Sequence, residues 1–300
     1  MRNTMRKHFT SALMGFAIIT GISATSYADD GAGLRYFFQQ SGQISSSIPY
    51  GNNTKAGRYA LSGDARIYYE TYGEGIPFVV LHGGGLGSSY EMGAFIDRLK
   101  ENFKVIAVST RGHGRSEIGH TPFTLKQRAD DIKAVLSDAG ISDAVMIIGF
   151  SDGGYAGYAM AAYYPDMVRK LITIGAGEVL QSNRRFVFSL DEWKSYDPAF
   201  IEQQRKLMPE PERWNEMLIM YENMWNGAVI SKDLFSRITA PVLVMGGDRD
   251  INSPMLTEIA AYQQLQNAQL SIIPNAPHAC FLANFDAVWN AIVPFIADGD

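Results

Sequence analysis

Ser151 stands between two glycines in the run Gly-Phe-Ser-Asp-Gly at 149–153. An apolar run at 144–148 precedes it and predicts a buried strand, and an Ala-rich run at 155–164 predicts a helix. A strand, Gly-x-Ser-x-Gly and a helix form the context of a nucleophile elbow, a tight turn that exposes a serine. The helix N-terminus there favours an anion formed beside it. Because glycine is abundant, the motif alone arises by chance in roughly one such chain in five, so further features must agree.

A glycine-rich segment follows another predicted strand. The strand is PFVVL at 77–81, and His82-Gly83-Gly84-Gly85 comes directly after it. Glycine lets the backbone approach a substrate oxygen within hydrogen-bond distance. We therefore expect the N–H groups of Gly84 and of Asp152, the residue after the serine, to bind an oxyanion. The alternative is a flexible turn.

A carboxylate and a histidine follow two strand-like runs near the end of the chain. The run at 241–245 leads into Gly-Gly-Asp-Arg-Asp at 246–250, and His278 follows the run at 270–273. A carboxylate just past a strand end is well placed to orient a histidine, and we assign this role to Asp250, with Asp248 as the alternative. Both aspartates could instead cap the helix that begins near Pro254.

The chain order of these residues, Ser151, Asp250 and then His278, is that of the serine hydrolases with the α/β-hydrolase fold, which the chain resembles from about Tyr59 to Ile296. The family's Arg-Gly-x-Gly-x-Ser turn is present at 111–116, although Ser109 stands where the family usually has Asp. The resemblance implies a mostly parallel eight-stranded sheet with helices on both faces and a small helical cap. It also implies a Ser-His-Asp triad that works through an acyl-enzyme without a cofactor.

Within that family, the elbow sequence Gly-Phe-Ser-Asp-Gly-Gly is most similar to valacyclovirase-type aminoacyl-ester hydrolases and related bacterial esterases. We expect a hydrolase of carboxylic esters, with α-amino acid esters or amides as a narrower class in which Asp152 pairs with a substrate ammonium. Asp152 could instead only stabilise the first turn of its helix. The alternative activities are a lactonase, a proline-iminopeptidase-like aminopeptidase, and a weakly catalytic ligand sensor on the same fold.

The elements that must position these residues alternate along the chain. A hairpin is predicted at 59–71, and strand-like runs alternate with helical patterns from there on, which indicates a mostly parallel sheet. Gly84, Ser151, Asp250 and His278 each lie just after a strand-like run, where reactive loops gather in such sheets. The strand-like runs after the hairpin lie at 78–81, 104–108, 144–148, 170–174, 241–245 and 270–273.

The alternation breaks at 178–233, between the two parts of the core at 57–177 and 234–300. This insert has no strand signal, and two helices are predicted in it, at 199–207 and 212–225. It contains three tryptophans, Trp193, Trp214 and Trp225. We predict that they wall a substrate pocket, and the alternative is that they form the cap's own core.

The N-terminus predicts export. Residues 1–28 combine a basic start, a short apolar segment and Ser-Tyr-Ala, so we predict a signal peptide cut after Ala28, followed by a flexible arm at 29–56. The cut would leave a periplasmic or secreted protein that is not inserted in the membrane. It removes three basic residues and changes the net charge from −5 to −8, which argues against nucleic acid as a partner.

The remaining composition argues against metal and disulfide chemistry. The five histidines have no metal-ligand spacing, and Cys280 is the single cysteine, so no internal disulfide can form. We expect Cys280 to be a partly buried residue at the start of the last helix, and we expect no metal and no cofactor. The expected partner is a small-molecule ester or amide, and the sequence makes no prediction of oligomeric state.

Overall fold

The computed structural model of the chain describes residues 34–39, 45–181 and 186–297. The predicted signal peptide, residues 1–28, and its cleavage site lie outside these residues. Within them, no helix combines the length and the apolar character that crossing a membrane requires.

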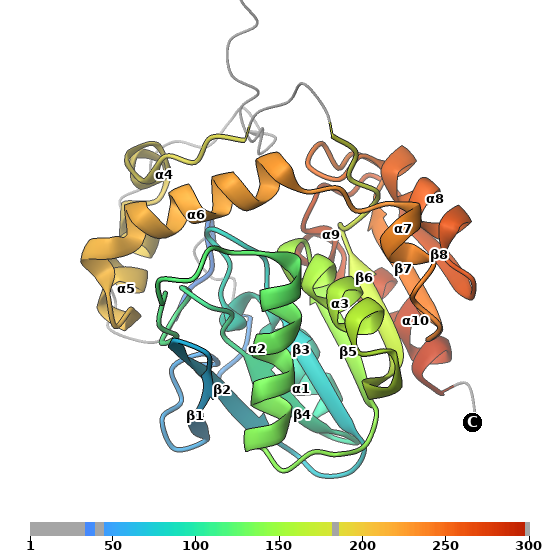
Figure 1. The fold of residues 1–300 in the computed structure, drawn as a ribbon, viewed down its shortest axis with the longest axis horizontal. Helices are drawn as coiled ribbons and strands as arrows, with labels where there is room; N and C mark the ends of the chain where they lie inside the picture. Colours follow the sequence, from blue (N-terminus) through green and yellow to red (C-terminus); the bar gives the residue numbers. More distant parts are fainter. Residues whose placement is uncertain (1–33, 40–44, 182–185, 298–300) are drawn as a thin grey trace, which may run out of the picture.

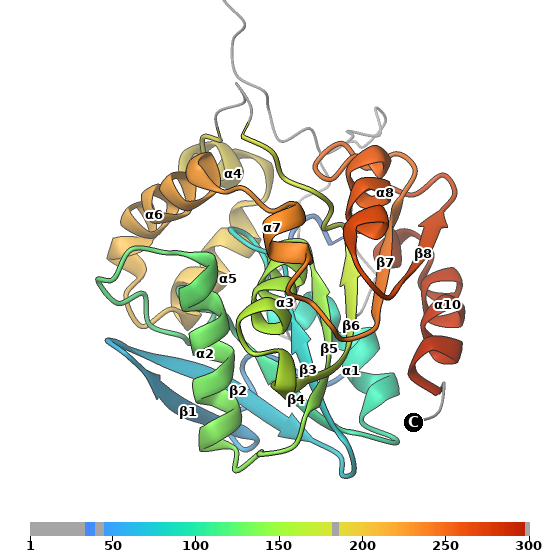
Figure 2. The same cartoon turned by 45° about the vertical axis from the view of Figure 1, so that its right-hand side comes forward.

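The described residues contain one eight-stranded sheet with the strand order β1-β2-β4-β3-β5-β6-β7-β8. The hairpin β1–β2 pairs antiparallel with the rest, and β3 to β8 are parallel to one another (Figures 1 and 2). The carboxyl ends of the parallel strands therefore meet at one edge of the sheet. The strands are β1 (Gly57–Ser62), β2 (Ala65–Tyr72), β3 (Pro77–Leu81), β4 (Lys104–Val108), β5 (Val145–Phe150), β6 (Val168–Ile174), β7 (Val242–Gly247) and β8 (Ala268–Ile273).

Helices cover both faces of the sheet because its central strands are apolar on both sides. In β5 every residue is buried, and alternate side chains enter different cores. Ile147 belongs to a cluster that includes residues of α2, α3 and α8, and Ile148 belongs to one that includes residues of α1 and α10. The core helices are α1 (Gly93–Leu99), α2 (Leu125–Asp138), α3 (Asp152–Tyr163), α7 (Lys232–Phe235), α8 (Met255–Gln264), α9 (Cys280–Ala283) and α10 (Phe285–Ala297).

The insert between β6 and β7 is helical and lies over the carboxyl ends of the strands (Figure 1). The two predicted helices are present as α5 (Pro198–Leu207) and α6 (Trp214–Gly227), and the structure adds α4 (Leu190–Tyr196). A third apolar cluster, formed mainly by these cap helices, includes Trp193, Trp214 and Tyr221. Val179 and Ile230 form an antiparallel bridge that ties the two ends of the insert together.

The prediction of a flexible arm at 29–56 is wrong for residues 45–56, because these residues pack on the core. Tyr50 is fully buried, and its hydroxyl donates a hydrogen bond to Asp97. The backbone N–H groups of Gly51 and Asn53 donate to the buried carboxylate of Glu70 on β2. These contacts bury backbone that the polar composition of the segment had suggested would stay in solvent.

The described part of the same arm at 34–39 crosses to the cap. The Arg35 guanidinium forms an ion pair of 2.8 Å with Asp197, which also accepts a hydrogen bond from the N–H of Phe38. The ring of Phe37 packs edge-on against Phe200 of α5. Residues 34–39 therefore form a strap that holds the junction of α4 and α5.

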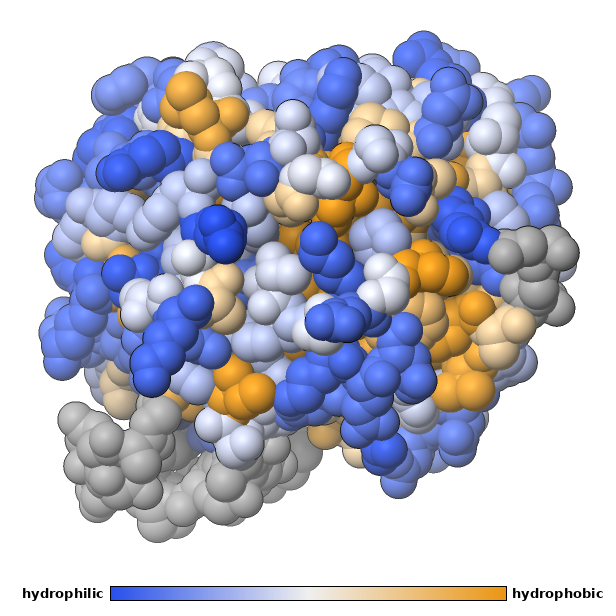
Figure 3. Space-filling model, turned by 90° about the horizontal axis from the view of Figure 1, so that it is seen from below, coloured by the Kyte–Doolittle hydropathy of each residue, from blue (hydrophilic) through white to orange (hydrophobic). Residues whose placement is uncertain are grey.

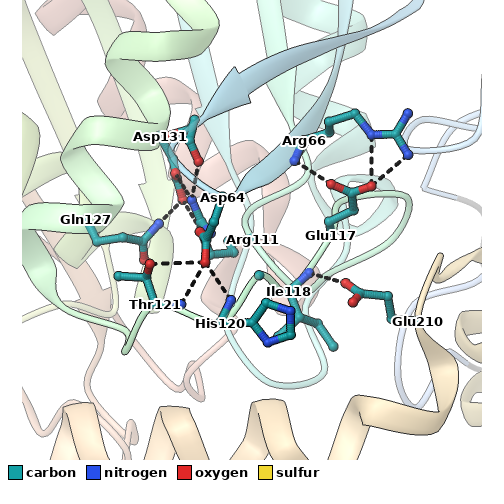
Figure 4. Close-up of polar contacts among 12 residues, drawn as sticks. Asp64, Arg66, Arg111, Glu117, Ile118, His120, Thr121, Gln127, Asp131 and Glu210 are labelled. Atoms are coloured by element: carbon teal, nitrogen blue, oxygen red, sulfur yellow. Dashed lines mark hydrogen bonds and ion pairs between the residues drawn. The ribbon is translucent and has the colours of Figure 1, made fainter.

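The loop at 109–121 of the core also contacts the cap, through a hydrogen bond between Ile118 and Glu210 (Figure 4). The buried guanidinium of Arg111 is held between Asp64 and Asp131, at 2.7 and 2.8 Å. Ile118 of the same loop donates its N–H to the Glu210 carboxylate of the cap. The face opposite the cap, seen in Figure 3, has apolar areas interrupted by polar residues.

Candidate active site

The tight turn between β5 and α3 presents Ser151. Its backbone has a positive φ of 51° and a ψ of −117°, a conformation that side chains adopt only under constraint. The two glycines make the turn possible. A methyl group at Gly149 would overlap the backbone of Gly153, and one at Gly153 would lie 2.6 Å from the carbonyl oxygen of His82.

The three residues predicted to form a triad lie together. The Oγ atom of Ser151 is 2.9 Å from Nε2 of His278, and Nδ1 of His278 is 2.7 Å from Oδ2 of Asp250. The other carboxylate oxygen of Asp250 accepts the N–H groups of Asn252 and Ser253, both at 2.8 Å. The Asp250 side chain is fully buried, whereas that of His278 is 16% exposed. The histidine can therefore take the serine proton while the aspartate holds the opposite ring nitrogen.

The geometry distinguishes Asp250 from the alternative, Asp248. Asp248 is exposed, and its Oδ1 accepts the N–H of Ala276 in the loop that carries His278. It therefore braces that loop, while Asp250 contacts the imidazole itself.

Two backbone N–H groups next to Ser151 are available to a ligand. Among the described residues, no acceptor takes a hydrogen bond from the N–H of Gly84 or from that of Asp152. The glycine loop is held from behind, because the Glu91 carboxylate accepts the Gly83 N–H at 2.6 Å. A methyl group at Gly84 would lie 2.7 Å from the Cβ of Asp152, so these two residues are neighbours. Two unpartnered N–H groups at a helix N-terminus suit an oxyanion.

The carboxylate of Asp152 is not the unpaired group that the ammonium hypothesis assumed. Its Oδ2 lies 3.2 Å from the Arg128 guanidinium and accepts a hydrogen bond of 3.1 Å from the Tyr221 hydroxyl. Burial raises the pKa of Asp152, and the charge of Arg128 opposes that rise. Arg128 thus supplies a counter-ion where the hypothesis placed a substrate ammonium.

The three tryptophans of the cap lie in different places. Trp193 approaches the glycine loop, where its ring would lie 3.0 Å from a methyl group at Gly85. Trp214 lines a small pocket with Gly85, under the cap. Trp225 packs edge-on against Tyr155 of α3 at 4.9 Å between ring centroids. Trp193 and Trp214 thus adjoin the glycine loop, while Trp225 contributes to the packing between cap and core.

Two buried carboxyl groups lie behind the site. Burial raises the pKa of Glu91 to about 8. Burial and the nearby charge of Asp250 raise the pKa of Glu258 to about 9. The Glu258 carboxyl lies directly against Gly246, in the strand that leads to Asp250.

Cys280 is fully buried at the start of α9, and burial raises its pKa to about 12, which makes it a poor nucleophile.

The sequence analysis did not identify Arg128 or Tyr221 as site residues. A signal for Arg128 was available, because it precedes Ile132 and Val135 at helical spacing and so falls on the buried face of α2. Tyr221 had no such signal, since its contacts depend on how the cap lies on the core. In the described ranges no group of three or more metal-ligating side chains comes together.

A family model described as the alpha/beta hydrolase fold matches residues 76–215. Serine hydrolase BPHL of Homo sapiens is 24% identical over 240 residues, covering 76% of this chain and 82% of that protein. Proline iminopeptidase PfmaB of Pestalotiopsis fici is 26% identical over 263 residues, covering 75% and 93%. A solved serine hydrolase involved in carbazole degradation, the CarC enzyme, superposes with a TM-score of 0.68 at 21% identity, covering 80% of this chain and 98% of its own.

Proposed function

Because the chain is a hydrolase with the α/β hydrolase fold, we propose that it cleaves carboxylic esters by acyl transfer to Ser151. The observation that carries this proposal is the continuous hydrogen-bonded chain from Ser151 through His278 to Asp250. Both contacts lie within hydrogen-bond distance, as proton transfer from Ser151 to His278 and orientation of the imidazole by Asp250 require.

In the first half of the reaction, His278 accepts the Ser151 proton while the serine oxygen forms a bond to the ester carbonyl carbon. Asp250 holds the proton on Nδ1 and stabilises the imidazolium that results. The carbonyl oxygen becomes negatively charged and accepts hydrogen bonds from the N–H groups of Gly84 and Asp152. When the carbon–oxygen bond to the alcohol breaks, His278 gives its proton to the leaving alcohol.

The second half repeats these steps with water. His278 takes a proton from a water molecule, whose oxygen attacks the acyl-enzyme, and the acid leaves as the proton returns to Ser151. No external group is consumed apart from water. The strained turn at Ser151 presents its Oγ to the ester carbonyl carbon in the first half.

Substrate choice on the acyl side is a finer part of the proposal. An ammonium next to Asp152 would meet a carboxylate that Arg128 already neutralises, so its electrostatic gain is reduced. We therefore propose plain carboxylic esters as the main class and expect only a small preference for α-amino esters. The rates for alanine ethyl ester and isobutyrate ethyl ester at pH 6, each divided by the rate of uncatalysed hydrolysis, measure that preference. The division is needed because the ammonium of the first ester also activates its carbonyl group.

The test of the proposed function uses residues 29–300 and the Ser151→Ala variant of the same chain. We expect ester turnover by the first protein and a loss of about 10³-fold or more in the variant. Mass spectrometry should also detect an acyl group on Ser151 after mixing with a slowly deacylating ester. Equal rates for the two proteins would overturn the proposal.

The same two proteins distinguish the proposed esterase from the alternative functions. Turnover of a lactone or of an N-terminal proline peptide at rates far above any ester would favour the lactonase or the aminopeptidase. Ligand binding without Ser151-dependent turnover of any of these substrates would favour the sensor.

We also propose that the protein is exported and cut after Ala28, on the evidence of the basic start and the short apolar segment. The expected mature N-terminus is Asp29. Mass spectrometry of the secreted and periplasmic fractions of a bacterial host would test this, and an intact Met1 form confined to the cytoplasm would contradict it.

A further inference from the structure

Tyr221 is a cap residue that reaches the proposed oxyanion hole. It lies on α6, is 1% exposed, and donates its hydroxyl hydrogen to Oδ2 of Asp152. Its ring lies against Gly84, where Cε1 would be 3.1 Å from a methyl group at that glycine. One side chain of the cap thus touches both residues whose N–H groups are proposed to bind the oxyanion.

The ring of Tyr221 also covers a buried ion pair. The Arg128 guanidinium lies 4.6 Å from the ring centroid, and the side chains of Arg128 and Asp152 are only 3% and 5% exposed. None of the three side-chain nitrogens of Arg128 makes a well-formed hydrogen bond to a described residue. The guanidinium also lies 5.3 Å from the centroid of the Phe123 ring, and the Tyr221 hydroxyl is the one well-formed hydrogen bond from a described residue to the Asp152 carboxylate.

We propose that Tyr221 is a positioning residue that couples closure of the cap to the oxyanion hole. Its hydroxyl holds the Asp152 side chain against Arg128, and its ring holds Gly84 against Asp152. Both N–H groups then converge on the same point only when the cap lies on the core. This inference rests on the proposed function, since it assigns the two N–H groups to the transition state.

The proposed role predicts which kinetic parameter, kcat or KM, changes when Tyr221 is replaced. Donors aimed at the oxyanion act on the transition state more than on the bound ester, so their displacement lowers kcat and leaves KM nearly unchanged. A residue that only shaped the substrate pocket would instead change KM, and would do so differently for small and large acyl groups.

The experiment compares Tyr221→Phe with a matched control, Tyr196→Phe. Tyr196 also lies in the cap and also donates its hydroxyl to a carboxylate at 3.1 Å, that of Glu192, but on the exposed surface. For both acetate and butyrate esters, we expect Tyr221→Phe to lower kcat roughly tenfold with KM within about twofold of the unaltered protein. The control should match the unaltered protein.

A second measurement does not depend on turnover. Trifluoromethyl ketones form a charged tetrahedral adduct with an active serine, and calorimetry gives their affinity. We expect Tyr221→Phe to weaken this affinity by the same roughly tenfold factor, while circular dichroism shows a cap and core folded as before.

The outcomes distinguish the two proposals. If the unaltered protein shows Ser151-dependent turnover and Tyr221→Phe keeps its kcat and its ketone affinity, the role of Tyr221 is refuted and the proposed function stands. A rise in KM alone also refutes it. If the unaltered protein shows no Ser151-dependent turnover and binds no ketone, the proposed function fails and this inference fails with it.

Discussion

Asp250 and Asp152 are two buried aspartates beside the same serine, and they are held in different ways. Asp250 accepts two N–H groups from its own loop together with the imidazole of His278. Asp152 is held by side chains far away in the sequence, Arg128 on α2 and Tyr221 in the cap. The first is set by its local turn, whereas the second depends on tertiary packing.

This contrast indicates which half of the site can respond to the position of the cap. The hydrogen bonds of Asp250 come from the β7–α8 loop and from His278, all within the core. The contacts of Asp152 include a residue of α6, so they change if the cap moves. The hydrogen bond between Asp250 and His278 should therefore persist whatever the position of the cap. The alignment of the N–H groups of Gly84 and Asp152 should instead depend on cap closure.

The substitution expected to cost the most activity is at Asp250, the aspartate held by its own loop. In Asp250→Asn the amide can still pack in place, but it no longer selects the imidazole tautomer, so we expect kcat to fall about 10³- to 10⁴-fold. Steady-state kinetics on a simple ester measures this. Asp248→Asn, which alters only the exposed brace, should keep kcat within a few-fold, and a comparable loss there would show that the two aspartates share the role.

The next prediction concerns the stability that the Arg128–Asp152 ion pair contributes. Arg128→Met leaves the Asp152 carboxylate buried without its counter-ion, so we expect the free energy of unfolding to fall by roughly 3–5 kcal/mol. Urea unfolding followed by tryptophan fluorescence measures the change. The double variant Arg128→Met with Asp152→Asn removes both charges and should recover most of the loss. A double variant no more stable than the single one would show that Arg128 acts by packing alone.

The last prediction tests Glu258, the buried acid behind Asp250, whose effect spreads over several pH units and is small at any one pH step. The pKa of Glu258 rises from 4.5 to about 9 on folding, so the folded chain keeps a proton that the unfolded chain loses between these values. The free energy of unfolding should therefore fall as pH rises through this window, by up to about 1.4 kcal/mol per pH unit. The Glu258→Gln variant has no carboxyl group at this position, so its free energy of unfolding lacks this dependence on pH.

The measurement for Glu258 is urea unfolding of both proteins at pH 6 and pH 8.5. The Gln variant should gain stability relative to the unaltered protein as pH rises. A constant difference between the two would mean that Glu258 is already ionised at pH 6, and that the surroundings of Asp250 are more polar than its burial indicates.

The same contrast explains what the sequence could predict. The sheet and the positions of Ser151, Gly84 and His278 follow from local signals, because apolar runs define strands and reactive loops follow their carboxyl ends. The fold class and the hydrolase activity that the family resemblance implied are confirmed by the comparisons. Asp250 could be preferred over Asp248 by position, and the structure brings it to the imidazole.

The contacts between distant segments were not predictable in the same way. No pattern in one sequence indicates that Tyr221 lies on Gly84, or that Arg128 neutralises Asp152, since both depend on packing between elements far apart in the chain. The prediction of a flexible arm at 29–56 is wrong for residues 45–56 for a related reason. Its polar composition suggests a free segment, but the buried Glu70 carboxylate supplies acceptors for its backbone.

The strap at residues 34–39 has a consequence for the order in which the molecule is completed. Arg35 pairs with Asp197, which lies 162 positions later in the chain. This segment therefore cannot bind its partner until the first part of the core, at 57–177, and the cap as far as Asp197 have been made. Because the strap holds the junction of α4 and α5, its docking can report that this part of the cap has folded.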